Sequence, residues 1–246
     1  MSPWWAVATF VVTVFTAGGL ARLVDPAASA DSPSLLWAAP AVAAGVTWLI
    51  GRRALAIMLP GPVPRRQLVA HTILGAAAAA LVVVLAAAGI GIATGIDAIP
   101  EHDARVDVLP LWLLAVPCAF ALELGWRGTL QPLVESRLGR MGASVAVGLV
   151  WAAWRLEVDE ASTIVGTIVT SIALSVLLGY LSTGAWWQRW ITAGVAQSIL
   201  TFAFAGFAWD GPRSLIVAAA SVVVTVAWLL MFRSAQRRRA RAADAA

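Results

Sequence analysis

The chain has 246 residues, of which 61% are apolar and 12% are charged, and its formal net charge is +4. A soluble domain of this length cannot bury so much apolar surface, so the composition excludes a soluble globular protein and predicts a polytopic membrane protein. The single cysteine, Cys118, excludes a disulfide framework within the chain.

Eight apolar runs approach the length needed to cross a hydrocarbon core of about 30 Å. In chain order they cover residues 4–24, 35–50, 68–92, 109–126, 143–154, 163–181, 190–207 and 215–232. The fifth run is short, which indicates a kinked or tilted helix, or one flanked by protein rather than lipid. The sequence therefore predicts an all-α polytopic membrane protein with about eight transmembrane helices.

The charges between the runs alternate along the chain. Arginines follow the second, fourth, sixth and eighth runs, whereas Asp and Glu dominate the other connections. By the positive-inside rule, this alternation predicts that both termini are cytoplasmic. Ala28-Ser29-Ala30 resembles a signal-peptidase site, but no basic segment precedes the long first run, so we expect an uncleaved anchor.

Residues 1–232 are predicted to form one transmembrane domain, and residues 233–246 a basic cytoplasmic tail. The tail is expected to attract anionic lipid headgroups, so membrane lipids are predicted partners. The alternative role of the tail is to fix the orientation of the last span. A multi-pass location in a cell membrane, the bacterial plasma membrane, is expected. The tail arginines are Arg233, Arg237, Arg238, Arg239 and Arg241.

Gly91 and Gly95 form a GxxxG pattern at the end of the third run. Small residues at this spacing let two helices approach closely. We expect the two glycines to serve packing within the chain rather than a dimer contact.

Glu123 and Arg127 carry opposite charges into the end of the fourth run. Residues four apart share one face of a helix, and ionisable groups at membrane depth are functional-site hypotheses by default. Glu123 either acts in chemistry or forms a mutually neutralising pair with Arg127 that makes burial tolerable. The pair is favoured, because the adjacent guanidinium holds the carboxylate ionised, whereas a general acid–base group must exchange its proton near neutral pH.

The stretch that begins at Glu123 and ends at Arg155 reads ELGWRGTLQPLVESRLGRMGASVAVGLVWAAWR. Together with residues 118–122, it resembles the CPBP family, which comprises type II CAAX prenyl endopeptidases and bacteriocin-processing or abortive-infection relatives. Glu123 and Arg127 match the second Glu and the Arg of the family's Glu-Glu-xxx-Arg motif. The resemblance implies an eight-span glutamate-dependent intramembrane protease fold, with a family core at about residues 109–207.

The remaining motif positions depart from the family. Leu122 replaces the first Glu, Arg155 replaces the His of the second motif, and Gln197 and Thr201 replace the His and Asn of the third. Leu122 cannot accept a proton, and Arg155 stays protonated, whereas Gln197 and Thr201 can still donate to an oxyanion. No catalytic residue is therefore expected, and Glu123 is the only candidate if the chain is active.

Arg155 has two alternative partners. If the fourth run continues as a helix to a chain reversal near Arg140, Glu123 and Arg155 lie on the two arms of an antiparallel hairpin. At 1.5 Å per residue they are about 25 and 22 Å from the reversal, and so nearly level with each other. The two could then form an ion pair across the hairpin. The alternative partners lie beside Arg155 in the sequence: Glu157, Asp159 and Glu160.

The seventh run contains three polar residues, Gln197, Ser198 and Thr201. The spacing of four places Gln197 and Thr201 on one helix face. We expect these side chains to bond their own helix or a neighbouring helix rather than a ligand.

His71 and His102 are the only histidines, and the predicted topology places them on opposite sides of the membrane. No metal site and no cofactor are therefore expected. The sequence contains no phosphate-binding glycine loop, nucleophile elbow or nucleic-acid-binding aromatic patch, so no nucleic-acid partner is expected.

The leading hypothesis is a non-catalytic pseudoprotease of the CPBP family that binds or scaffolds a membrane-embedded or lipidated protein or peptide. The first alternative is an active intramembrane endopeptidase whose rearranged site uses Glu123 and Gln197. A third hypothesis is a small transporter subunit, but interrupted helices at matching positions in the two halves, the sign of such a fold, are missing.

Overall fold

The computed structural model describes residues 3–26, 34–95, 108–156, 160–205 and 211–244. These residues form helices and turns, with no β-strand among them, so the predicted all-α class is confirmed. In chain order the elements are α1 (Pro3–Val24), the 3₁₀ turn η1 (Leu35–Ala38), α2 (Ala39–Met58), α3 (Arg65–Thr94), α4 (Val108–Gly125), the π-helical turn η3 (Trp126–Leu130), α5 (Gln131–Arg155), α6 (Ala161–Leu181), α7 (Trp186–Ala205) and α8 (Pro212–Asp244).

Some sequence predictions fall outside the described residues. They concern the segment 28–30, His102, and the acids Glu157 and Asp159. The side chains of Arg238, Arg239 and Arg241 in the tail are likewise outside what the structure describes.

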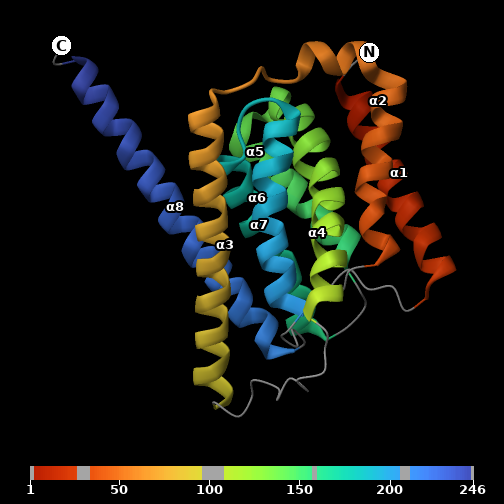
Figure 1. Cartoon of the computed structure of the whole chain (residues 1–246), viewed down its shortest axis with the longest axis vertical. Coiled ribbons are helices and arrows are strands. Elements are labelled where there is room, and N and C mark those ends of the chain that lie inside the picture. The colour runs from red at the N-terminus through yellow and green to blue at the C-terminus, as the bar shows by residue number, and fades with distance from the viewer. Residues whose placement is uncertain (1–2, 27–33, 96–107, 157–159, 206–210, 245–246) are drawn as a thin grey trace.

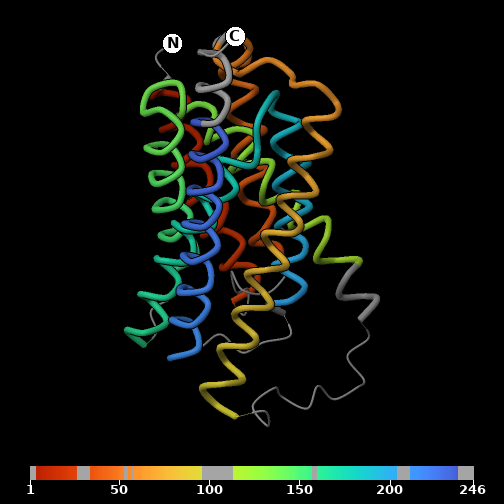
Figure 2. The backbone as a smooth tube through the Cα atoms, turned by 90° about the vertical axis from the view of Figure 1, so that its left-hand side faces the viewer, coloured from red at the N-terminus to blue at the C-terminus, as the bar shows by residue number. Residues whose placement is uncertain are grey.

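The helices run in alternating directions along the long axis of the bundle (Figure 1). Both chain ends therefore lie at the same end of the molecule, as Figure 2 also shows. In the middle, α4 packs against α7 and α5 against α6, while α1 and α2 form one side of the bundle. On the other side, α8 leans away from α3 toward its C-terminus (Figure 1).

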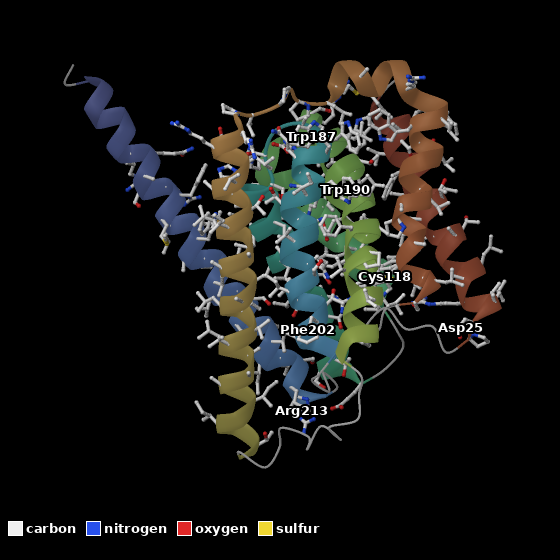
Figure 3. The ribbon with its side chains drawn as sticks, viewed as in Figure 1. Asp25, Cys118, Trp187, Trp190, Phe202 and Arg213 are labelled. Carbon is white, nitrogen blue, oxygen red and sulfur yellow. The ribbon has the colours of Figure 1, made fainter. Side chains whose placement is uncertain are left out.

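Arginines gather at the end of the bundle where both termini lie, which we call the basic end. Here α2 ends, α3 begins, α5 turns, α7 begins and α8 ends. Glu135 is the only acidic residue at this end whose side chain is described, whereas Asp25 and Glu160 lie toward the opposite end (Figure 3 labels Asp25). The described arginine side chains of the basic end are those of Arg52, Arg65, Arg66, Arg137, Arg140, Arg189, Arg233 and Arg237.

Six segments of the described chain are long and apolar enough to cross a membrane, which is the pattern of a multi-pass membrane protein. One of the six, Leu113–Arg155, contains a chain reversal and so covers both α4 and α5. Helix α7 is not among the six, because Gln188 and Arg189 make its first turn polar.

The chain reverses within α5 at Gly139, whose φ of +68° and ψ of 174° are not helical. Glycine adopts this positive φ without the steric cost that a Cβ would bring. Across the turn, the ring centroids of Trp126 and Trp154 lie 5.9 Å apart, and the Arg127 guanidinium lies 5.4 Å from the Trp151 ring. The members of each pair are similarly distant from Gly139 along the chain, so the predicted antiparallel hairpin is confirmed.

Glycines permit the closest helix crossings. A Cβ added at Gly148 would lie 2.7 Å from the Cα of Ile172 and 2.9 Å from the Cβ of Ser175 on α6. A Cβ added at Gly125 would overlap Pro40, so α2 and α4 meet there backbone to backbone. Such close approach provides the van der Waals contact that associates helices in lipid.

The predicted packing role of Gly91 and Gly95 is wrong. A Cβ at either position would meet no described atom within 4 Å, and Gly95, with a φ of +83°, ends α3. A third glycine, Gly89, makes the contact with α8 instead, because a Cβ there would lie 2.7 Å from Ile216.

Gly148→Ala is expected to lower the free energy of unfolding by about 1–3 kcal/mol, the usual range for overpacking. The added methyl would press on the α6 backbone at Ile172, which cannot rotate away as a flexible side chain would. Unfolding in mixed detergent micelles, followed by circular dichroism, measures the change. Gly91→Ala is the matched control, since it adds the same methyl to open space, and it is expected to be neutral or slightly stabilising. Equal losses in the two variants would contradict the packing of α5 against α6.

Candidate functional site

Glu123 and Arg127 form a fully buried ion pair at the junction of α4 and η3. The Arg127 Nε lies 3.6 Å from Glu123 Oε2, and both side chains are 0% exposed. Neither carboxylate oxygen and none of the three guanidinium nitrogens makes a hydrogen bond with the described residues. The pair therefore neutralises charge without the hydrogen bonds that usually accompany buried ions.

Proline shapes the helix around this pair. Pro132 has no N–H to donate to the preceding turn, and the backbone widens into the π-helical turn η3, where the Gln131 N–H bonds the Trp126 carbonyl. The Thr129 hydroxyl likewise donates to the Leu124 carbonyl, five residues earlier, at 3.2 Å. Arg127 thus lies within a wide turn, a feature that often occurs at functional sites.

Large side chains fill the space between this turn and the second half of α5. Trp126 contacts Phe10 and Trp154 edge to face, at centroid distances of 5.6 and 5.9 Å. Trp151 lies beside the Arg127 guanidinium at 5.4 Å, close enough for a cation–π contact. Trp126 and Trp151 are both at most 1% exposed, so the charge pair is enclosed by rings.

Leu122 and Arg155 lie at the edges of this enclosure. Leu122 is 2% exposed and belongs to the main apolar core together with Trp126 and Trp151. Arg155 is half-buried, and its guanidinium lies 5.6 Å from the Trp151 ring. Leucine therefore fills the position that the sequence resemblance aligns with the first Glu of the CPBP motif.

The hairpin places Glu123 and Arg155 level, as expected, but they form no hydrogen-bonded pair. The Glu123 oxygens accept no hydrogen bond from the described residues, and the Arg155 guanidinium lies over the Trp151 ring. Trp151 therefore lies beside two guanidinium groups, those of Arg127 and Arg155.

Gln197 and Thr201 do not reach the charge pair. The Trp190 Nε1 donates to the Phe120 carbonyl at 2.7 Å, and Gly194 also faces the Phe120 ring. This alignment of α4 with the antiparallel α7 places Gln197 about six residues, or about 9 Å, beyond the level of Glu123. Gln197 and Thr201, which the sequence resemblance aligns with the third motif, thus do not lie level with Glu123.

The polar residues in the second half of α7 bond their own helix. The Gln197 Nε2 donates to Thr201 Oγ1 at 3.4 Å, and the Ser198 hydroxyl donates to the Gly194 carbonyl at 2.7 Å. The shared face of Gln197 and Thr201 is confirmed. Gln197 Oε1 is buried and accepts no hydrogen bond from the described residues.

A second polar cluster lies at the basic end, and sequence reasoning missed it. Glu135 accepts a 2.6 Å hydrogen bond from Arg189 Nη1 and a 3.2 Å bond from Arg140 Nε. His71 Nδ1 lies 2.8 Å from the Thr183 hydroxyl nearby. A cavity of about 900 Å³ opens beside these groups. In the sequence, only the short spacing of Glu135 and Arg140 indicates such a cluster. Arg189 is distant in the chain and is brought to Glu135 by the packing of the helices.

Gln188 fixes one wall of this cavity. Its Oε1 accepts from the backbone N–H of Val63 at 2.8 Å and of Ala185 at 3.1 Å, while its Nε2 donates to the Val63 carbonyl at 2.8 Å. The α2–α3 connection is thereby held against the start of α7. Among the described residues, no three His, Cys, Asp or Glu side chains gather into a metal-binding group.

Comparison with protein-family models and with curated proteins finds no match to this chain. The evidence on function is therefore the geometry of the two polar clusters and the sequence resemblance.

Proposed function

We propose that the chain is a non-catalytic membrane protein with a CPBP-like scaffold, which acts by binding a membrane-embedded or lipidated client. In this proposal it crosses the bacterial plasma membrane eight times, with both termini and the basic end in the cytoplasm. The charge distribution supports that orientation, because arginines favour the cytoplasmic side.

The complete burial of Glu123 against Arg127 carries the proposal. A peptidase base must reach both water and substrate, whereas this carboxylate is 0% exposed and lies beside Arg127, which Trp151 covers in turn. Leu122 and Arg155 supply no replacement base. Gln197 would be the oxyanion donor of a rearranged site. It lies about 9 Å beyond the level of Glu123 along α7, too far for the two to act on one peptide bond.

The same filling restricts where a client can bind. The space between η3 and the second half of α5 is occupied by aromatic rings and Arg127, so a client has to contact other surfaces. The apolar faces of α1 and α3 are exposed along their length and are suited to lipid or a transmembrane segment; they include Val12, Leu20, Ile73, Leu81 and Val84.

Incubation of the purified protein in liposomes with an S-farnesylated fluorescent peptide tests this function. We expect saturable binding of the lipidated peptide, weaker binding of the same peptide without the lipid, and no cleavage above that of the Glu123→Gln variant. Cleavage that Glu123→Gln abolishes would establish the endopeptidase instead. Absence of binding to both peptides would contradict a role in holding lipidated clients.

A further inference from the structure

The cavity at the basic end exists because α8 diverges from its neighbour. Near the opposite end, α3 and α8 are joined by the apolar cluster of Ala86, Ile90, Val217 and Ala220. Toward the basic end α8 leans away (Figure 1), and the cavity of about 900 Å³ lies between these helices, the α5 turn and the α6–α7 connection. This volume is in the range of small-molecule binding sites.

The polar floor of the cavity has a surplus positive charge. Glu135 is bound by both Arg140 and Arg189, and it is the only acidic residue among the lining side chains. Arg189 is fixed further, because its Nε donates to the Gly184 carbonyl at 3.0 Å. Among the described residues, Arg140 uses only Nε for hydrogen bonding, so its Nη1 and Nη2 groups can still donate.

The opposite wall is apolar and aromatic. Tyr180 and Phe232 contact edge to face at 5.6 Å, and Trp228 and Leu74 also line the cavity. The Arg140 guanidinium lies 5.6 Å from the Tyr180 ring, so the free donors adjoin the apolar wall. A charged group beside an apolar surface fits an amphiphile better than a free ion.

We propose that this cavity binds an anionic phospholipid, with Arg140 donating to its phosphate and Trp228 and Phe232 contacting its acyl chain. A guanidinium presents a planar pair of donors that matches two phosphate oxygens. Leu74 of α3 lines the cavity and is itself 39% exposed, so a lipid can enter sideways past this helix. This lipid site is additional to the proposed client-binding function, and it does not depend on whether the chain cleaves peptides.

This site differs from general attraction of lipid by the basic tail. Attraction by exposed arginines is screened by salt and does not depend on which arginine supplies the charge. A lipid seated in the cavity depends on Arg140 and on the aromatic wall. Arg137 offers the comparison, because it is exposed, lies three residues before Arg140 on the other side of the Gly139 turn and does not line the cavity.

Calorimetric titration of the detergent-purified chain with dioctanoyl phosphatidylglycerol tests the proposal. Arg140→Gln is expected to weaken binding about ten-fold or more, the effect of losing a charged hydrogen-bonding contact, while Arg137→Gln leaves it unchanged. Phe232→Ala is expected to weaken lipid binding as well. Inorganic phosphate and dioctanoyl phosphatidylcholine, titrated in parallel, are expected to bind more weakly than phosphatidylglycerol.

Three outcomes would overturn the proposal. Equal losses in Arg140→Gln and Arg137→Gln would show diffuse surface attraction. Inorganic phosphate binding as tightly as the lipid, with Phe232→Ala unaffected, would show a site for a free anion. Binding unaltered in both Arg140→Gln and Phe232→Ala, each checked for native circular dichroism, would place the lipid elsewhere.

Discussion

Arg127→Leu is expected to lower the free energy of unfolding by about 3–5 kcal/mol, the cost of leaving one member of a buried ion pair without its partner. Glu123 would remain at 0% exposure with no opposite charge and no described hydrogen bond. The change also removes the cation–π contact with Trp151. Denaturation in mixed micelles, followed by circular dichroism, measures the loss.

A double-mutant cycle distinguishes the pair from two independent residues. Glu123→Leu alone should be similarly costly, whereas Glu123→Leu combined with Arg127→Leu should recover most of the stability, because no buried charge remains. Arg137→Leu is the matched control on the exposed surface and should change stability by less than about 0.5 kcal/mol. Glu123 and Arg155 should show weaker coupling, since Arg155 stacks on Trp151.

Additive losses in the cycle would contradict the enclosed pair. Independent effects are expected only if water reaches Glu123 and screens it from Arg127, and a solvated Glu123 could again serve as a base. The stability measurement therefore also bears on the proposed loss of proteolysis.

The helices and the hairpin were predictable because both depend on local sequence. Apolar runs fix the helices, since a membrane-spanning segment must satisfy its own backbone hydrogen bonds. The turn at Gly139 follows from the glycine and the flanking arginines. The level placement of Glu123 and Arg155 then required only the helical rise.

The cavity at the basic end was not predictable, because its parts meet only in the fold. Glu135 and Arg189 are 54 residues apart in the chain, and nothing in the segment around either residue indicates that the two side chains meet. The α4–α7 alignment is also non-local, and it separates Gln197 from Glu123 despite the spacing that matches the family motif. Gly91 and Gly95 show the same limit, since a small-residue pattern does not indicate which helix it will meet.

Introducing at position 122 the Glu of the family that the sequence resembles should damage the fold rather than create a protease. Leu122→Glu would place a carboxylate at a site that is 2% exposed and surrounded by core side chains. A charged residue at the centre of a membrane-spanning helix costs about 2.5–3.5 kcal/mol on insertion scales, and the neighbouring Glu123 already holds the same charge. We expect a loss of about 3 kcal/mol in the free energy of unfolding, measured in the same micelles.

Leu122→Met is the matched control, because it keeps volume and apolarity and should cost less than about 1.5 kcal/mol. Leu122→Glu stability equal to that of Leu122→Met would mean that solvent or a partner cation reaches position 122. In that case the variant should be assayed for cleavage of the farnesylated peptide, since two carboxylates would then share an accessible site. A large loss instead indicates that the core has closed around the leucine, so that the site is packed too tightly to hold a second carboxylate.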